Sequence, residues 1–179
     1  ARVGVAAPSS LAAPTGPYHN TGGEAILVDP SRKASGYHQH KEHFGFRSVL
    51  LRMKGWTLHY ISAYFDAEWS LESGPNAHKW QAILSLITSM NAPWIIAADF
   101  NRTPEEVAHS TFVKFLDGIV VAPAVDFTCA SAPPPGRVID MVVSCKSCFP
   151  YLAVKPYYAH PFKPHVVALS LELSLDIEE

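Results

Sequence analysis

Five polar residues stand inside or at the ends of apolar runs, at positions where a side chain could take part in chemistry: Asp99, Asn101, Asp140, His165 and Tyr64. Asp99 ends the run WIIAA, and Asp140 lies inside RVIDMVV. A carboxylate buried among apolar residues is costly unless it meets a cation, a metal ion or hydrogen-bond donors. The two acids are therefore the first candidates for a reaction centre.

Each of these residues also has an ordinary structural interpretation. Asp140 can point to solvent, because alternate residues of a strand face outward. Asp99 and Asn101 can be turn residues before a helix. His165 can be a structural histidine that pairs with a nearby carboxylate or carbonyl, and Tyr64 can be a packing aromatic. Taken singly, the residues do not decide between chemistry and structure.

Strand-like runs carry all five candidates. The alternating segment 47–67 predicts two strands that turn at Lys54-Gly55, the second from Trp56 to Tyr64. Further strands are predicted at EAILVD, PWIIAAD, GIVV, RVIDMVVSC, FPYLAVKPYY and PHVVALSLELSL. The segment SRKASGYHQHKEHFGF is too irregular to predict a regular element.

Two helices are predicted between these strands. The first is NAHKWQAILSLITSMN, with Asn76 as N-cap and Asn91 as its stop. The second is TPEEVAHSTFVKFL, with Thr103 as N-cap, Pro104 at the first helical position and Glu106 completing a capping box.

The order of elements predicts one domain. Strands outnumber helices and many are hairpin-like, which predicts an α/β sandwich of two mixed or mostly antiparallel sheets flanked by helices. No glycine-rich phosphate loop is present, which argues against a nucleotide-binding fold. We expect an irregular segment over 1–21, the domain over 22–175 and a short tail over 176–179.

Composition narrows the classes of partner. A net charge of −2 gives no overall basic field, so a polyanion would have to be met by local charge or a metal ion. Arg32, Lys33 and Lys41 form a local basic cluster that either contacts a phosphate backbone or is a solvated loop. The apolar runs are too short to predict a transmembrane span.

The chain has three cysteines, Cys129, Cys145 and Cys148. They are too few for a disulfide scaffold, which favours a reducing, intracellular compartment. Cys145 and Cys148 form a Cys-x-x-Cys motif, for which packing, redox chemistry and metal binding all remain open.

The order of the segments resembles the endonuclease/exonuclease/phosphatase superfamily, which includes pancreatic deoxyribonuclease, apurinic endonucleases, retrotransposon endonucleases and phosphoinositide phosphatases. The resemblance spans about Gly22 to Leu173. The matching segments are GGEAILV, ISAYFDA, PWIIAADFNRTPEE, FTCASAPPPGRVIDMVVS and KPHVVALSL.

The resemblance implies a deoxyribonuclease-like fold and hydrolysis of a phosphate ester, in nucleic acid or another partner, with magnesium or manganese. Asp99 would orient or deprotonate the attacking water and touch the metal ion, and Asn101 would hold the water or a phosphate oxygen. Asp140 would orient the imidazole of His165, which would contact the scissile phosphate. Tyr64 would bond a phosphate oxygen.

The chain departs from the family pattern in several places. Ala98 replaces a glycine, and Pro164 replaces the acid that precedes the family's histidine. Nothing matches the family's first strand with its Asn, or the Glu that is its principal metal ligand, so we expect a fragment of a larger protein that lacks the first strands. We expect weak or absent hydrolysis by this chain.

Two other functions stay open at this stage. One is an inactive relative that serves as a binding or scaffold module, or a decayed copy from a mobile element. The other is a phosphatase that acts on lipid or inositol phosphates.

Overall fold

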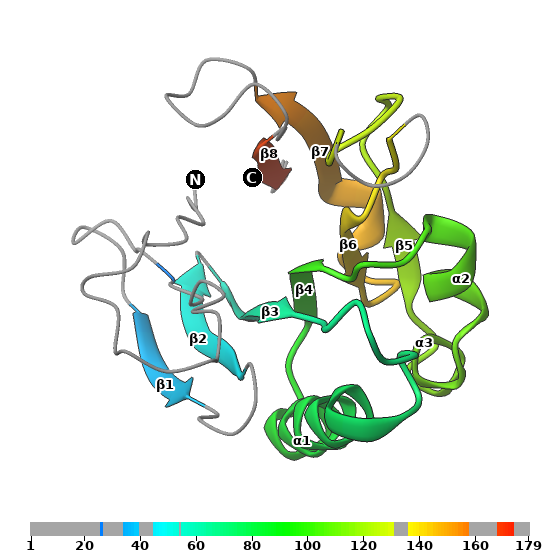
Figure 1. The fold of residues 1–179 in the computed structure, drawn as a ribbon. Helices are drawn as coiled ribbons and strands as arrows, with labels where there is room; N and C mark the ends of the chain where they lie inside the picture. The colour runs from blue at the N-terminus through cyan, green and yellow to red at the C-terminus, as the bar shows by residue number, and fades with distance from the viewer. Residues whose placement is uncertain are drawn as a thin grey trace, which may run out of the picture.

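Two β-sheets organise the computed structural model, which describes residues 26, 34–39, 45–53, 55–130, 136–157 and 168–173 (Figure 1). The larger sheet has the order β1-β2-β3-β4-β6-β5, and the smaller sheet pairs β7 with β8. Strands β3 and β4 run parallel, and the other paired strands among the described residues run antiparallel. The strands are β1 (Ala34–Gln39), β2 (Phe46–Met53), β3 (Trp56–Tyr64), β4 (Trp94–Asp99), β5 (Ile119–Val121), β6 (Asp140–Ser144), β7 (Leu152–Tyr157) and β8 (Ala168–Leu173).

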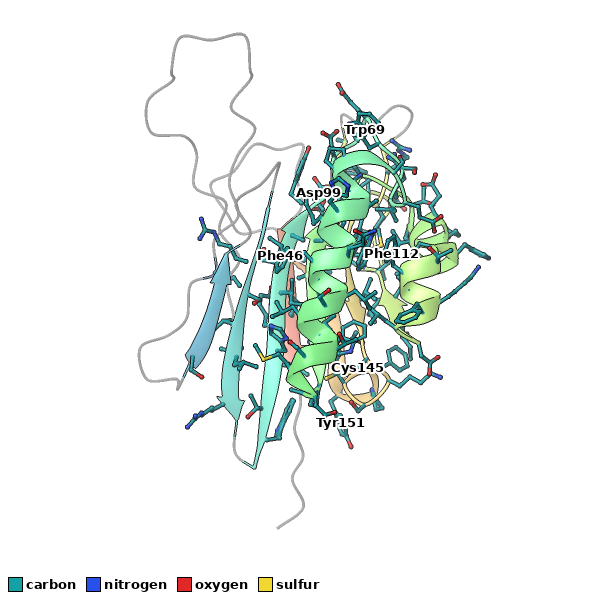
Figure 2. All side chains as sticks on the ribbon, turned by 90° about the horizontal axis from the view of Figure 1, so that it is seen from below. Phe46, Trp69, Asp99, Phe112, Cys145 and Tyr151 are labelled. Carbon is teal, nitrogen blue, oxygen red and sulfur yellow. The ribbon has the colours of Figure 1, made fainter. Side chains whose placement is uncertain are left out.

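The large sheet is covered on both faces. Alternate residues of a strand point to opposite faces. In β4, Ile96 joins a core cluster with Trp80, whereas Ile95 joins a second cluster with Leu171 of β8. Figure 2 shows α1 (Gly74–Met90) lying along the helical side of the sheet. The predicted sandwich of two mixed, mostly antiparallel sheets flanked by helices is therefore confirmed.

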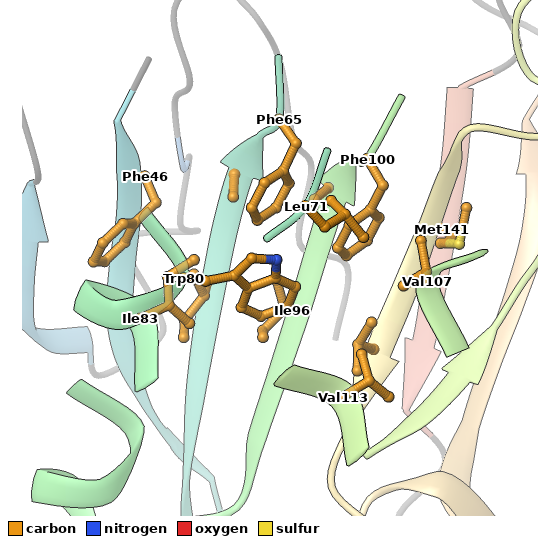
Figure 3. Packing of buried hydrophobic residues seen from close by; sticks show 14 of the residues in the cluster. Phe46, Phe65, Leu71, Trp80, Ile83, Ile96, Phe100, Val107, Val113 and Met141 are labelled. Carbon is orange, nitrogen blue, oxygen red and sulfur yellow. The ribbon is translucent and has the colours of Figure 1, made fainter. Parts of the chain in front are cut away.

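An aromatic cluster on the helical face fixes the strand exits that carry the candidate site (Figure 3). Phe65 follows β3 and Phe100 follows β4, and their rings stack with centroids 5.1 Å apart. The ring of Trp80 in α1 is fully buried, and its centroid lies 5.1 Å from the centroid of the Phe65 ring. Because Phe65 and Phe100 are each the neighbour of a candidate residue, this packing holds Tyr64 and Asp99 in place.

The first predicted helix begins earlier than the sequence indicated. Helix α1 starts at Gly74 with Ser73 as N-cap, so the prediction of Asn76 as N-cap is wrong. Pro75 is tolerated in the first turn, where its missing N–H costs nothing, and the helix extends back through it. The predicted stop is confirmed, because Asn91 adopts the left-handed conformation with φ 43°.

The second predicted helix is two short helices. Thr103, Pro104 and Glu106 form the predicted capping box at the start of α2 (Pro104–His109). The helix then breaks at Ser110, whose ψ of 147° is extended and whose side chain accepts a hydrogen bond from the Val113 N–H. Ser110 thereby caps α3 (Thr111–Phe115), an alternative that helical periodicity does not reveal.

Three strand predictions need correction, although the hairpin of β2 and β3 and the short strand β5 are confirmed. Strand β1 lies in a segment predicted to be irregular, because its pairing with β2 shifts register between Ser35 and His38 and so breaks the alternation. Strand β6 begins at Asp140, which is therefore at the strand's start and not inside it. A 3-10 turn, η1 (Phe149–Tyr151), precedes β7 and shortens that strand.

Several predictions lie outside the described residues. They include the strand at 24–29 apart from Ile26, the basic cluster with Arg32, and the boundaries at 21 and 175. Within the described ranges, no helix combines the length and the apolar character that a membrane crossing requires.

Candidate functional site

Four of the five candidate residues come together at one end of the large sheet, three of them on its strands. Tyr64 ends β3 beside Asp99, which ends β4, and Asp99 pairs in register with Asp140, which begins β6. Residues paired in this way project from the same face of a sheet. The sequence predicts each residue as a candidate, but the pairing of the strands is what places them side by side.

The strand exits are tied to one another by backbone hydrogen bonds. The Phe65 N–H donates to the Asp99 carbonyl oxygen at 2.8 Å, and the Phe100 N–H donates to the Ile139 carbonyl oxygen at 2.9 Å. The ladder therefore continues one residue past Asp99. These hydrogen bonds fix the position of the backbone at Asp99.

The two aspartates form a pair of like charges in a half-buried place. Burial and, to a smaller extent, the charge of Asp140 raise the pKa of the Asp99 carboxyl to about 7, against the opposing effect of a hydrogen bond from the Asn101 N–H. Burial also raises the pKa of Asp140, against a hydrogen bond with Thr128. Two carboxyl groups held this way share protons readily and attract cations.

Asn101 shapes the turn that follows β4. Its φ of 50° is left-handed, a conformation that asparagine tolerates better than most residues. Its N–H donates to Asp99 Oδ1 at 2.9 Å, and its side-chain amide donates to the Phe65 carbonyl oxygen at 2.8 Å. Its side chain also hydrogen-bonds with the Tyr64 hydroxyl group. Asn101 therefore holds Asp99 and Tyr64 in a common arrangement.

Tyr64 is half-buried beside this turn. Burial raises the pKa of its hydroxyl group, with a further rise from the charge of Asp99 and a smaller one from Asp66, while the hydrogen bond with Asn101 lowers it. The buried Lys79 of α1 donates to the Tyr64 carbonyl oxygen. The hydroxyl group therefore remains a protonated hydrogen-bond donor at neutral pH.

Thr128 holds Asp140 through hydrogen bonds, a role that the sequence did not predict. Its hydroxyl oxygen accepts hydrogen bonds from the N–H groups of Ile139 and Asp140, each at 3.0 Å. Its side chain is fully buried and also hydrogen-bonds with the Asp140 carboxyl group. The signal in the sequence was a threonine ahead of the Ile-Asp strand, which serves here as a positioning residue.

Arg102 and Asn76 hold the loop between β3 and α1 through hydrogen bonds. The sequence did not predict this role for either residue. The guanidinium group of Arg102 donates to the carbonyl oxygens of Asn101 and Trp69, each at 2.6 Å. The fully buried amide of Asn76 accepts from the Asp66 N–H and donates to the carbonyl oxygens of Asp66 and Trp69, each at 2.9 Å. For Asn76, the signal in the sequence was a polar residue at the start of a helical pattern.

His165 and Pro164 lie outside the described residues, so the predicted partnership of Asp140 with His165 remains a prediction. Of the predicted site, the structure brings together Tyr64, Asp99, Asn101 and Asp140.

The donor set of the site suits a hard divalent cation. Mg²⁺ in proteins is commonly held by one or two carboxylates and completes its shell with water and phosphate oxygens. Asp99 and Asp140 supply two carboxyl groups side by side; burial is the main cause that raises the pKa of both, and a cation between them would favour their charged forms. Within the described part of the chain, no group of three or more His, Cys, Asp or Glu side chains is placed to hold a metal ion.

Comparison with known proteins identifies the fold. No protein-family model matches the sequence, and a search of curated proteins finds no match. Among solved structures, the chain resembles the endonuclease domain of TRAS1, a telomere-specific non-LTR retrotransposon, with a TM-score of 0.64 and 12% identity over 97% of this chain and 81% of that one. It also resembles an endonuclease/exonuclease/phosphatase family protein from Leptotrichia buccalis, with a TM-score of 0.53 and 11% identity over 82% of this chain and 62% of that one.

A third similar structure carries metal. The beta toxin of Staphylococcus aureus, in a mutant form with bound magnesium ions, matches with a TM-score of 0.50 and 14% identity over 73% of this chain and 58% of that one. Together these structures show that the chain has the fold of the endonuclease/exonuclease/phosphatase superfamily, as the resemblance in sequence implied.

Proposed function

We propose that the chain is a phosphoesterase-type domain of the nuclease kind, which cleaves phosphodiester bonds at the pair formed by Asp99 and Asp140. The observation that carries this proposal is the register of β4 and β6, which sets the two half-buried carboxyl groups opposite each other. The similar fold of the TRAS1 endonuclease domain supports nucleic acid as the substrate class.

Each residue of the site has a role that its surroundings favour. Asp99 orients the attacking water or accepts a proton from it, because its half-buried carboxyl group lies opposite Asp140 and is held by the Asn101 N–H. Asn101 orients that carboxyl group, and the Tyr64 hydroxyl group donates to a phosphate oxygen. Asp140 orients the imidazole of His165 toward the scissile phosphate.

A divalent ion fits the same place. Asp99 would hold magnesium or manganese, with Asp140 as a neighbouring carboxylate. When bound, such an ion supplies charge neutralisation at the phosphate oxygens and an oriented water. The magnesium-bound beta toxin supports this choice of ion.

An exposed tryptophan favours a nucleic acid over an inositol or lipid phosphate. Trp69 is 44% exposed and lies at the same end of α1 as Asp99 (Figure 2). Its carbonyl oxygen is held by Arg102, and Gly74 lets the indole lie close, since a Cβ on Gly74 would approach Trp69 Cε3 to 2.5 Å. A fixed, exposed indole is a surface on which a base can stack.

We expect slow turnover by this chain. Pro164 stands where the family carries an acid, and proline has neither a charge nor a backbone donor to offer there. The same residue offers a test, because Pro164→Asp restores the carboxylate. We expect slow nicking of supercoiled plasmid with magnesium or manganese, faster nicking by Pro164→Asp, and a loss of about 100-fold or more when Asp99→Asn is added.

The matched control is Asp117→Asn, which removes an exposed carboxylate that pairs with Lys146 at the surface. Asp117 has a φ of 50°, which asparagine adopts easily, so this variant should nick like its parent. The proposal fails if Pro164→Asp gains nothing and Asp99→Asn loses nothing in folded protein. Binding of an oligonucleotide without any cleavage would favour an inactive binding module, and release of phosphate from inositol phosphates alone would favour a phosphatase.

A further inference from the structure

Two cysteines face each other across a tight turn at the end of β6, far along the strand from the aspartate pair. The Cys148 N–H donates to the Cys145 carbonyl oxygen at 3.1 Å, and the Phe149 N–H donates to the same oxygen at 3.2 Å. A turn closed between positions i and i+3 holds its end Cα atoms within about 7 Å. Disulfides span Cα separations of about 4.4 to 6.8 Å, so the backbone is already close to the geometry of a bridge.

The side chains of this pair have unequal surroundings. The two thiols hydrogen-bond with each other, and both cysteines are free. Cys145 Sγ also accepts a hydrogen bond from the Trp94 N–H at 3.3 Å and lies 3.2 Å from Ser147 Oγ. Cys145 is half-buried, whereas Cys148 is only 2% exposed.

These surroundings separate the reactivity of the two sulfurs. The hydrogen bond from Cys148 is the main cause that lowers the pKa of the Cys145 thiol to about 5, helped by Ser147 and the Trp94 N–H. The same hydrogen bond, together with burial, raises the pKa of Cys148. Because the thiolate is the attacking species, Cys145 is an accessible nucleophile at neutral pH, and Cys148 is a shielded thiol beside it.

We propose that Cys145 and Cys148 are a redox site that a small-molecule disulfide converts into an intramolecular disulfide. The Cys145 thiolate attacks one sulfur of the reagent, whose S–S bond breaks and releases one thiolate. Cys148 then gives up its proton and attacks Cys145 Sγ, forming the protein disulfide and releasing the second thiolate. The two cysteines lose two electrons and the one proton of Cys148, and the reagent takes them up and leaves as one thiol and one thiolate.

The position of this pair defines what the bridge would constrain. Cys145 directly follows β6, and Cys148 directly precedes η1, which leads into β7 of the smaller sheet. Cys145 lies at the opposite end of α1 from Asp99 (Figure 2). The bridge would therefore stiffen the connection between the two sheets without touching the phosphoesterase site, and this inference does not depend on the proposed function.

Mass spectrometry of the whole chain tests the proposal. Reduced protein is treated with oxidised glutathione, free thiols are alkylated and the protein is digested with trypsin, which cleaves after Lys146 between the two cysteines. We expect a pair of peptides linked through Cys145 and Cys148, cleaved apart by reductant. Cys129 should remain alkylated, and Cys129→Ser should behave like the wild type.

Two further measurements distinguish the first attack, by Cys145 on the reagent, from the second attack, by Cys148 on Cys145. Cys148→Ser should accumulate a glutathione adduct on Cys145, because the second step is blocked, and Cys145→Ser should form neither adduct nor bridge. In wild type at pH 6, iodoacetamide should modify Cys145 at least about tenfold faster than it modifies a cysteine in a short unfolded peptide, because the thiolate fraction sets the rate. The proposal is overturned if oxidised wild type keeps both cysteines separately alkylated, or if Cys145 reacts no faster than the peptide cysteine.

Discussion

Replacing Asp99 by asparagine should make the folded chain more stable at alkaline pH. Burial and the charge of Asp140 raise the Asp99 pKa from 3.8 to about 7. At about 1.4 kcal/mol per pKa unit, this rise corresponds to roughly 4 kcal/mol as an upper bound. Asparagine keeps an oxygen that accepts the Asn101 N–H but removes the charge.

The sign of the pH dependence follows from proton binding. Between pH 4 and pH 7 the folded state binds more protons at Asp99 than the unfolded state, so the free energy of unfolding falls as the pH rises through this window. The wild type should therefore lose up to about 4 kcal/mol relative to Asp99→Asn between pH 4 and pH 8. Urea unfolding at several pH values, without divalent ions, measures the difference, and Asp117→Asn serves as the control.

Magnesium should reverse part of this loss. A ligand that binds only the folded state at tenfold above its Kd adds about 1.4 kcal/mol to the free energy of unfolding. We expect this gain at pH 8 in the wild type and not in Asp99→Asn. The reasoning is refuted if Asp99→Asn shows the same difference from the wild type at pH 4 and pH 8, or if it is the less stable protein at pH 8.

Two other predictions concern the loop beside the site. Asn76→Ala should lower the free energy of unfolding by about 2 to 3 kcal/mol, because it removes the fully buried amide that bonds the Asp66 N–H and the Asp66 carbonyl oxygen; urea unfolding measures this, and the exposed Ser89→Ala should change little. Trp69→Ala should weaken binding of a short single-stranded oligonucleotide by about 1 to 3 kcal/mol, as measured by fluorescence anisotropy. Phe115→Ala, at a side chain 71% exposed, should bind normally, and equal losses in both variants would contradict a stacking role.

Local signals in the sequence predicted local structure well. The capping box of Thr103 and Glu106 and the left-handed stop at Asn91 depend on neighbours within a few residues, and both are present. The wrong predictions concern residues whose partners lie farther away in the sequence. Asn76 has a helix-capping side chain, but its hydrogen bonds go to a loop up to ten residues away, and nothing in the local pattern reveals that partner.

The candidate site shows where such prediction ends. The order of the motifs predicted Asp99 and Asp140 as site residues. Each also had an ordinary interpretation as a turn or a surface residue. Their mutual distance depends on the register of β4 and β6, because a slip of one residue would turn one carboxyl group to the opposite face of the sheet. The raised pKa of Asp99 follows from that register and from the burial it produces, so the chemistry of the pair belongs to the fold and not to either motif alone.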